Sequence, residues 1–224
     1  MVGSPLSQLL SGRMDVAEFV ALIVALVVGI TVHEFSHAFA ATWLGDPLPG
    51  RQGRLTLSPA AHLDPMGSLM FFVGGFGWGR PVQSNPYALR AGPRSGMMLV
   101  ALAGPVSNVI LAAFFAIIVR AMELGIGASG IASDLGFVGG VLELFTAMVW
   151  YNLILGFFNL IPVAPLDGFT ILLGLLPPTL AFQFEQIRNY GMLVLFALVF
   201  FVPGVLTVLL YRPVSLLFQL LIGF

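Results

Sequence analysis

Two histidines and a glutamate stand together at His33, Glu34 and His37, in the order His-Glu-x-x-His. Residues four apart lie on one face of a helix, about one turn from each other, so both imidazoles can bind one metal ion. Glu34 then lies beside the metal, where it can take a proton from a bound water. Zinc lowers the pKa of such a water toward about 7, which makes hydroxide available at neutral pH. The motif therefore predicts zinc-dependent hydrolysis.

A catalytic zinc usually has three protein ligands, so a third ligand must come from elsewhere in the chain. Asp167 is the strongest candidate, because it is the only acidic residue in the apolar stretch 145–184. Burying it without a partner would cost several kcal/mol, and a metal cation would remove that cost. His62 and other carboxylates are alternatives for the third ligand. Asp167 could instead cap the apolar helix that begins after it.

The composition places these residues in a membrane. The chain of 224 residues is 58% hydrophobic and 8% charged, with a mean hydropathy of +1.01. Soluble domains carry about 25% charged residues, so lipid is the expected solvent for this surface. The net charge of -1 argues against nucleic-acid binding, which needs a basic surface. The absence of cysteine excludes disulfides and thiolate chemistry.

We predict an all-α polytopic membrane protein with a single domain over residues 1–224. A spanning helix needs about 20 mostly apolar residues. The expected core consists of three long transmembrane helices, at residues 16–44, 94–122 and 137–160. A short helix is expected at residues 169–176. Pro203-Gly204 interrupts the last apolar region, so residues 190–224 form either one kinked helix or two short ones.

Residues 45–93 break this pattern, because they are rich in glycine and proline. The alternation in 55–58 is typical of a strand, whereas 69–77 is apolar but too short and too glycine-rich to span a membrane. We therefore predict a small β/re-entrant element, with short strands, within 53–87. Non-helical backbone at membrane depth is tolerated only where protein or a wet cavity satisfies it, so a water-accessible cavity is expected here.

Arginines set the expected orientation. Five of them lie in this segment or at its edge: Arg51, Arg54, Arg80, Arg90 and Arg94. Positive loops stay cytoplasmic, so this segment should face the cytoplasm, with the N-terminus and the acidic loop 123–134 outside. The two histidines and Asp167 then reach similar depth near the cytoplasmic side. The expected location is a bacterial or archaeal cell membrane, with the active site toward the cytoplasm.

Several segments together resemble the site-2 protease family of intramembrane zinc metalloproteases. They are HEFSH at 33–37, in a first membrane helix, and NLIPVAPLDG at 159–168 far downstream. Further matching segments are GRLTLSPAAHLDP at 53–65, FGWGRPVQSNP at 76–86 and ALAGPVSN at 101–108. The resemblance covers about residues 20–175. Unlike larger members, the chain has no room for a PDZ domain or a C-terminal nucleotide-sensing module, so it resembles a compact form.

The resemblance implies roles for five residues. His33, His37 and Asp167 would bind one zinc per chain, and Glu34 would be the catalytic base. Asn159 matches the asparagine ahead of the family's LDG motif, which implies that it holds the substrate or the oxyanion. The implied substrates are transmembrane proteins cleaved in or near their membrane segments, and the lipid bilayer is the other partner. The oligomeric state stays open.

Three further residues are weaker candidates for substrate binding. Asn108, in the segment that resembles the family's second-helix signature, is expected to point into the site. Asn152 lies inside an apolar helix, where it could bind substrate, although an interhelical hydrogen bond is the more usual role. His62 could equally reach the cavity or bond to loop backbone.

Two other functions compete with a protease. A metal transporter would place a site inside the membrane, but such proteins often show inverted repeats, and no repeat is apparent in this sequence. A transport site also has no need of Glu34 between the two histidines. A protease-like scaffold that has lost activity is the third reading, and the intact His-Glu-x-x-His motif with Asp167 disfavours it.

Overall fold

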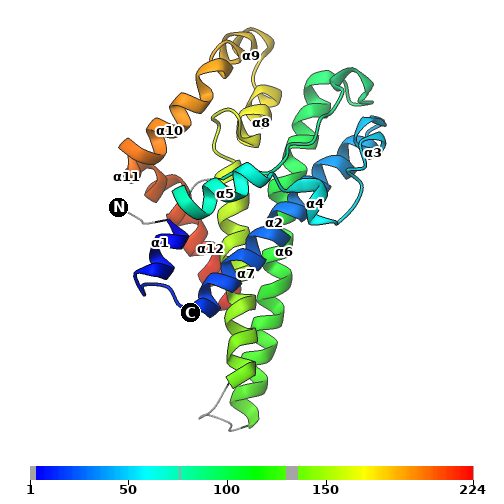
Figure 1. Cartoon of the computed structure of the whole chain (residues 1–224). Coiled ribbons are helices and arrows are strands. Elements are labelled where there is room, and N and C mark those ends of the chain that lie inside the picture. The colour runs from blue at the N-terminus through cyan, green and yellow to red at the C-terminus, as the bar shows by residue number, and fades with distance from the viewer. Residues whose placement is uncertain (1–3, 76, 130–135, 224) are drawn as a thin grey trace.

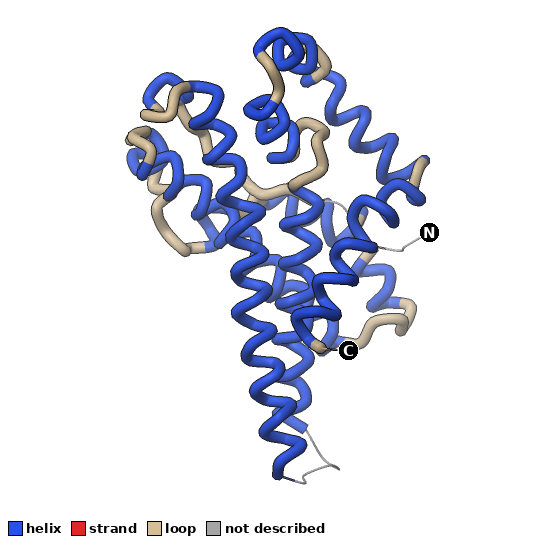
Figure 2. Tube along the Cα trace, turned by 180° about the vertical axis from the view of Figure 1, so that it is seen from behind, coloured by secondary structure: helices blue, strands red, loops and turns tan. Residues whose placement is uncertain are grey.

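The computed structural model describes residues 4–75, 77–129 and 136–223, which are helical apart from connecting segments (Figures 1 and 2). Three long helices make up the body: α2 (Val16–Trp43), α6 (Pro93–Ser129) and α7 (Gly136–Asn159). Each of the three packs against the other two. Among the described residues, five helical stretches are long and apolar enough to cross a membrane: Val16–Trp43, Pro93–Ile126, Gly136–Asn159, Pro178–Phe201 and Gly204–Ile222. The predicted all-α, multi-pass class is confirmed.

Local signals fix the ends of α2, the helix that carries the His-Glu-x-x-His motif. At its start the Asp15 side chain accepts from the Glu18 N–H at 2.8 Å, and the Glu18 side chain accepts from the Asp15 N–H at 2.9 Å. This reciprocal capping satisfies two backbone donors that the helix leaves unpaired. Gly45 follows the helix with a φ of 110°, a conformation that only glycine adopts readily.

The second long helix extends further than predicted. The sequence suggested an end at residue 122 and a flexible loop over 123–134, but α6 continues to Ser129. Gly125 lies inside this helix. A glycine costs a helix only about 1 kcal/mol, which continued backbone hydrogen bonding in an apolar environment can outweigh. The remainder of the expected loop, residues 130–134, lies outside the described residues.

The predicted strands at 53–87 are not formed among the described residues. The segment consists instead of short helices: α3 (Leu48–Arg51), α4 (Pro59–His62), α5 (Pro65–Gly74) and the 3-10 turn η1 (Pro86–Ala88). One isolated antiparallel bridge joins Leu63 and Gly79. The alternation at 55–58 was misleading because so short a run needs a partner strand, and the prolines that follow start helical turns. Phe76, within the expected re-entrant stretch, lies outside the described residues.

The region after α7 is a succession of short helices. They are α8 (Asp167–Leu175), α9 (Pro178–Glu185), η2 (Arg188–Tyr190), α10 (Gly191–Phe201), α11 (Pro203–Leu206), a π-helical turn (Thr207–Tyr211) and α12 (Arg212–Ile222). Gly191, which starts α10, packs against Ala164 in the loop before Asp167. At the other end, Arg120 of α6 donates to the Leu220 carbonyl at 3.1 Å. Residues 191–201 and 203–222 thus form two helical stretches with a break at Val202 (Figure 1).

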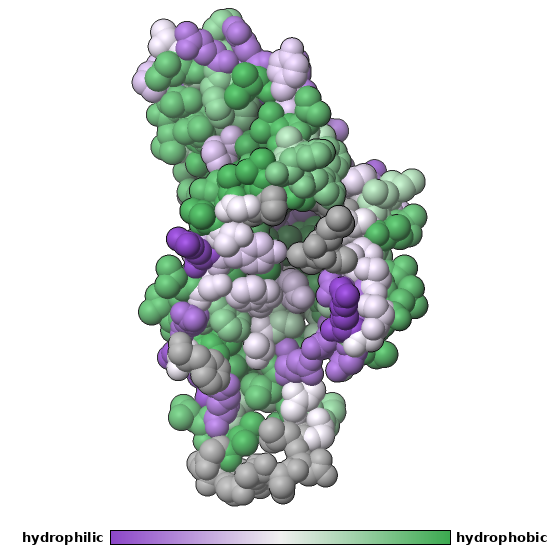
Figure 3. Space-filling view, turned by 90° about the vertical axis from the view of Figure 1, so that its left-hand side faces the viewer, coloured by the Kyte–Doolittle hydropathy of each residue, from purple (hydrophilic) through white to green (hydrophobic). Residues whose placement is uncertain are grey.

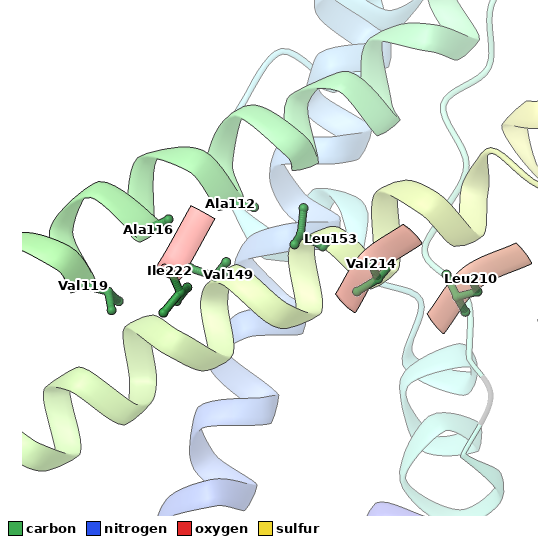
Figure 4. Packing of buried hydrophobic residues seen from close by; sticks show 8 residues of the cluster. All are labelled: Ala112, Ala116, Val119, Val149, Leu153, Leu210, Val214 and Ile222. Carbon is green, nitrogen blue, oxygen red and sulfur yellow. The ribbon is translucent and has the colours of Figure 1, made fainter. Parts of the chain in front are cut away.

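Small and branched side chains pack the body of the bundle. A buried cluster joins α6, α7 and α12 (Figure 4). Its members are Ala112, Ala116, Val119, Val149, Leu153, Leu210, Val214 and Ile222. The outside is apolar too, and Figure 3 shows hydrophobic residues dominating the upper part of one face, with hydrophilic residues at its top end and again across its middle. An apolar exterior of this extent suits lipid better than water. A shorter helix, α1 (Pro5–Leu10), lies beside α5 and the start of α2.

Candidate metal centre

Three potential metal ligands converge where α2 meets the start of α8. The Asp167 Oδ2 atom lies 3.0 Å from His33 Nε2 and 3.3 Å from His37 Nε2. The two Nε2 atoms are 3.0 Å apart. Zinc bonds of about 2.0–2.2 Å in a tetrahedron separate neighbouring ligand atoms by about 3.3 Å, so this spacing suits one zinc ion. In the described part of the chain, no other group of three histidine or acidic side chains comes together in this way.

The helix pair α2 and α6 sets the positions of the imidazoles. His33 and His37 are one turn apart on α2, both are buried, and their rings meet edge to face with centroids 4.6 Å apart. Gly104 of α6 lies directly against them. A Cβ at that position would fall 2.5 Å from His37 Nε2 and 2.6 Å from His33 Cε1. A glycine is therefore required at 104 for α6 to approach the histidine pair this closely.

Hydrogen bonds to the other ring nitrogens fix the tautomers. His37 Nδ1 lies 2.8 Å from the Val100 carbonyl oxygen, which can only accept, so this nitrogen carries a proton. His33 Nδ1 lies 2.6 Å from Asn108 Oδ1, and the Asn108 amide nitrogen donates to the Gly29 carbonyl at 3.1 Å. His33 Nδ1–H is therefore the donor to Asn108. Both neutral imidazoles then present an Nε2 lone pair to the cluster, the arrangement that metal-binding histidines need.

The two candidate asparagines inside the bundle lie in a chain of hydrogen bonds that leads to His33. Asn108 and Asn152 are fully buried. The Asn108 amide nitrogen also donates to Asn152 Oδ1 at 2.9 Å, and the Asn152 amide nitrogen donates to the Met148 carbonyl at 2.8 Å. Asn108 thus orients His33. Asn152 makes an interhelical hydrogen bond, which is the more usual role of an asparagine inside an apolar helix. Their contact with a substrate stays a prediction.

Asp167 does not cap its helix. It is the first residue of α8, Leu166 is in the capping position, and no side chain there accepts a capping hydrogen bond. Its Oδ2 atom is buried and has no hydrogen-bond partner, although the two Nε2 atoms are close. Leaving a buried acceptor unpaired costs about 1–3 kcal/mol, and more for a charged group. A metal cation among these atoms would remove that cost, so the donor set fits zinc.

Glu34 is half-buried on the same turn of α2 and is not one of the three converging ligands. Its Oε2 atom accepts from the backbone N–H of Val82 at 3.2 Å. Gly79 also lies close, since a Cβ there would fall 3.5 Å from Glu34 Oε1. Backbone from the segment between α5 and η1 therefore borders the glutamate.

The two other candidates lie outside the cluster. His62 is fully buried in α4, and its Nε2 lies 2.7 Å from the Thr56 carbonyl oxygen, so it bonds to loop backbone. The Asn159 amide nitrogen donates one N–H to the Leu155 carbonyl of its own helix at 2.9 Å, and its second N–H takes no part in that bond. Sequence reasoning did not find Val82 and Val100, because they act through backbone groups that leave no signal in the side chain.

Comparisons with known proteins agree with a zinc-dependent hydrolase. Residues 127–202 match the sequence pattern of Peptidase family M50. The chain is 40% identical over 175 residues to the "Putative zinc metalloprotease YwhC" of Bacillus subtilis, covering 77% of this chain and 76% of the relative. It is 31% identical over 192 residues to the "Putative zinc metalloprotease Rip2" of Mycolicibacterium smegmatis, covering 82% of this chain and 68% of the relative.

A Mycobacterium tuberculosis protein with the same Rip2 name is 33% identical over 211 residues, covering 90% of this chain and 74% of the relative. No solved structure matches the chain significantly. The match to Peptidase family M50 includes Asp167 and Asn159 but begins after the His-Glu-x-x-His motif. The relatives, in contrast, align over most of the chain.

Proposed function

Because this chain belongs to peptidase family M50, the site-2 protease family, and is a zinc metalloprotease, we propose that it is an intramembrane endopeptidase. Its substrates would be membrane proteins, cut within or near their transmembrane segments. The observation that carries the proposal is the position of the ligand cluster. His33, His37 and Asp167 converge inside a bundle of membrane-spanning helices, with the half-buried Glu34 beside them.

We assign the three converging residues as the zinc ligands, with one zinc per chain. Three protein ligands leave a fourth position free, which distinguishes catalytic zinc sites from structural ones. When bound there, zinc would supply a Lewis acid that polarises a carbonyl and lowers the pKa of water toward about 7. Asn108 and the Val100 carbonyl would hold the imidazoles in the required tautomer, as hydrogen-bonded outer partners do at other metal sites.

Glu34 would be the general base and then the general acid. The Val82 N–H holds its Oε2 atom, while Oε1 makes no hydrogen bond to the described residues and is free to accept a proton from the attacking water. The same carboxyl group would then act as the general acid and return the proton to the leaving amine. Asn159 is proposed to donate its remaining N–H to the oxyanion, a contact typically worth about 3 kcal/mol.

The substrate helix must unwind before its peptide bonds can be attacked, since a helix hides them among its own hydrogen bonds. Residues 80–85, which form neither helix nor strand, lie next to Glu34. We propose that the unwound substrate lies along this segment and pairs with its backbone, as extended peptides do when they bind other proteins. This non-helical segment replaces the predicted β-strands as the docking element.

The cluster lies toward the cytoplasmic end of the bundle in this proposal. Gly104, which touches both histidines, is eleven residues into α6, and α6 begins at the arginine-rich segment. Positive loops stay cytoplasmic, so that end should face the cytoplasm. The chain is a multi-pass membrane protein, and its bacterial relatives suit the proposed location in a bacterial cell membrane.

The test is cleavage of a transmembrane peptide by detergent-purified protein with measured zinc content. The wild type should cleave, lose activity with a chelator and regain it with zinc. Glu34→Gln should keep its zinc but cleave about 10²- to 10⁴-fold more slowly, because it lacks the proton acceptor. A zinc-loaded Glu34→Gln protein that cleaved at the normal rate would remove the proposed base. A folded, zinc-loaded wild type that cleaved no membrane peptide would favour a non-enzymatic site.

A further inference from the structure

Residues 79–82, here called the strap, cross the face of α2 at Glu34. The Val82 N–H donates to Glu34 Oε2 at 3.2 Å. At the other end of the strap, a Cβ on Gly79 would fall 3.0 Å from Ile30 Cγ2 and 3.5 Å from Glu34 Oε1. The strap therefore contacts the helix surface beside Glu34 and holds one of its two carboxylate oxygens. The orientation of Glu34 depends on where this backbone lies.

Arg54 holds the strap from behind. It is buried, with 8% of its surface exposed. Its Nη1 donates to the Arg80 carbonyl at 3.0 Å, and its Nη2 donates to the Pro81 carbonyl at 3.3 Å. These two carbonyls immediately precede Val82 in the chain. A planar guanidinium with several fixed donors is the side chain best suited to hold adjacent backbone carbonyls in one geometry.

The same guanidinium ties the strap to α4. Arg54 Nη1 also donates to the Ala61 carbonyl at 2.5 Å, and the Arg80 N–H donates to the His62 carbonyl at 2.7 Å. The end of α4, the Arg54 side chain and the strap are thus joined by four hydrogen bonds. Displacing the guanidinium would therefore release the end of the strap that contains Val82.

The charge of Arg54 is not used in an ion pair. Across the residues that the structure describes, no carboxylate lies within ion-pair distance of its nitrogens. Burial and the like charge of Arg80 lower the pKa of the Arg54 guanidinium, and Glu34 opposes this shift. The group remains charged, as arginines do in proteins. A buried cation that makes three hydrogen bonds to backbone carbonyls and no ion pair is placed for geometry and not for charge pairing.

We propose that Arg54 is a positioning residue for peptide hydrolysis, which fixes the strap so that the Val82 N–H orients the Glu34 carboxylate. This proposal rests on the proposed role of Glu34 as the base. It assigns to Arg54 an effect on the rate of the chemical step, transmitted through two carbonyls and one N–H. A merely structural role would instead change protein yield, zinc content or substrate affinity.

The first test compares Arg54→Gln and Arg54→Lys with the wild type. Arg54→Gln should lower kcat by about 10- to 100-fold, because misplacing a reacting group by about 1 Å can cost 100-fold. KM and zinc content should stay within about twofold of the wild-type values. Arg54→Lys should recover part of the rate, since one ammonium can still reach one or two of the carbonyls. Arg51→Gln, an exposed arginine in the preceding helix, is the control and should cleave normally.

The second test removes the backbone donor itself and stands even if the Arg54 variants misfold. Val82→Pro lacks the N–H that Glu34 accepts from, whereas Val82→Ala keeps it. The proline variant should lose at least about tenfold more kcat than the alanine variant, at equal zinc content.

Three results would overturn the proposal: an unchanged kcat in Arg54→Gln, a loss confined to KM, or a loss of zinc that accounts for the lost activity. Equal rates for Val82→Pro and Val82→Ala would do the same. Failure of the proposed function looks different, because the zinc-loaded wild type would then cleave no membrane peptide in the same assay. An active wild type with insensitive Arg54 variants refutes the positioning role alone.

Discussion

The two sides of the candidate metal centre are built differently. His33 and His37 lie in the C-terminal half of α2, which packs against both other long helices, and each Nδ1 is held by a hydrogen bond. Asp167 lies at the start of the nine-residue helix α8, with 19% of its side chain exposed and its Oδ2 unpaired. The histidine side is therefore preorganised by the fold, while the carboxylate side gains its missing partner only from the metal.

The anchoring of α8 also differs from that of α2. Arg94 of α6 donates to the carbonyls of Leu173 and Gly174, and contacts the Leu176 carbonyl, at the C-terminal end of α8. Beyond α8, the helix α10 is largely exposed, with only Gly191 and Leu195 buried. The carboxylate is thus carried by the first residue of a short helix, which is held on α6 by Arg94 and by the packing of Gly174 against Met98. The comparison teaches that the fold holds two candidate ligands by hydrogen bonds to their rings, whereas the third has a buried oxygen without a partner.

The comparison predicts unequal losses when single ligands are removed. His33→Ala should abolish zinc binding, whereas Asp167→Ala should leave weak binding by the two imidazoles that α2 still holds at 3.0 Å. Both losses should exceed the 10- to 100-fold that removing an outer partner typically costs. Competition of each purified variant with a chelator of known affinity measures the difference. Undiminished binding in Asp167→Ala would move the third ligand elsewhere, with His62 tested first.

A methyl group at Gly104 should disturb the preorganised side alone. Gly104→Ala places a carbon 2.5 Å from His37 Nε2, so either the imidazoles or the two helices must shift. Because displacements of about 1 Å can cost 100-fold, we expect peptide cleavage to fall by about that factor and zinc affinity to fall with it. Gly125→Ala in the same helix is the control, since its Cβ meets nothing within 4 Å. Equal activity in the two variants would show that the histidine side tolerates movement.

The smallest effects should come from the asparagines behind His33. Asn108→Ala leaves the His33 Nδ1–H without its acceptor and should weaken zinc binding or activity by about 10- to 100-fold. Asn152→Ala acts one hydrogen bond further away. Such bonds between membrane helices average about 0.6 kcal/mol, so its loss should stay under about tenfold. The same zinc competition and cleavage assays rank the two, and a reversed order would contradict the orienting role of Asn108.

Features that depend on composition and local chemistry could be predicted from the sequence. Long apolar runs closed by glycine and proline gave α2 and α7 to within about one residue, because the bilayer sets helix length. Asp167 could be singled out because an isolated carboxylate in an apolar stretch needs a partner. Its place beside His33 and His37 in space agrees with the expected shared depth of the two motifs.

Features that depend on tertiary contact could not be predicted. The Val82 N–H and the Val100 carbonyl act on Glu34 and His37 through backbone, which any residue type supplies. The loop expected over 123–134 was partly wrong, since Gly125 continues a helix, and the close approach that Gly104 permits depends on a second helix. The expected strands failed for a related reason, since a four-residue alternation carries no information about whether a partner strand exists.

The chain of polar groups from His33 through Asn108 to Asn152 passes through all three long helices. Much of the remaining contact between α6 and α7 is apolar packing, which fixes the alignment of two helices less strictly than hydrogen bonds do. A shift of one helix by a single residue moves its side chains by about 1.5 Å and turns them by about 100°. That would strand a buried amide in an apolar interior. The hydrogen bonds among these three side chains thus select one alignment of α2, α6 and α7 out of the many that hydrophobic packing alone would accept.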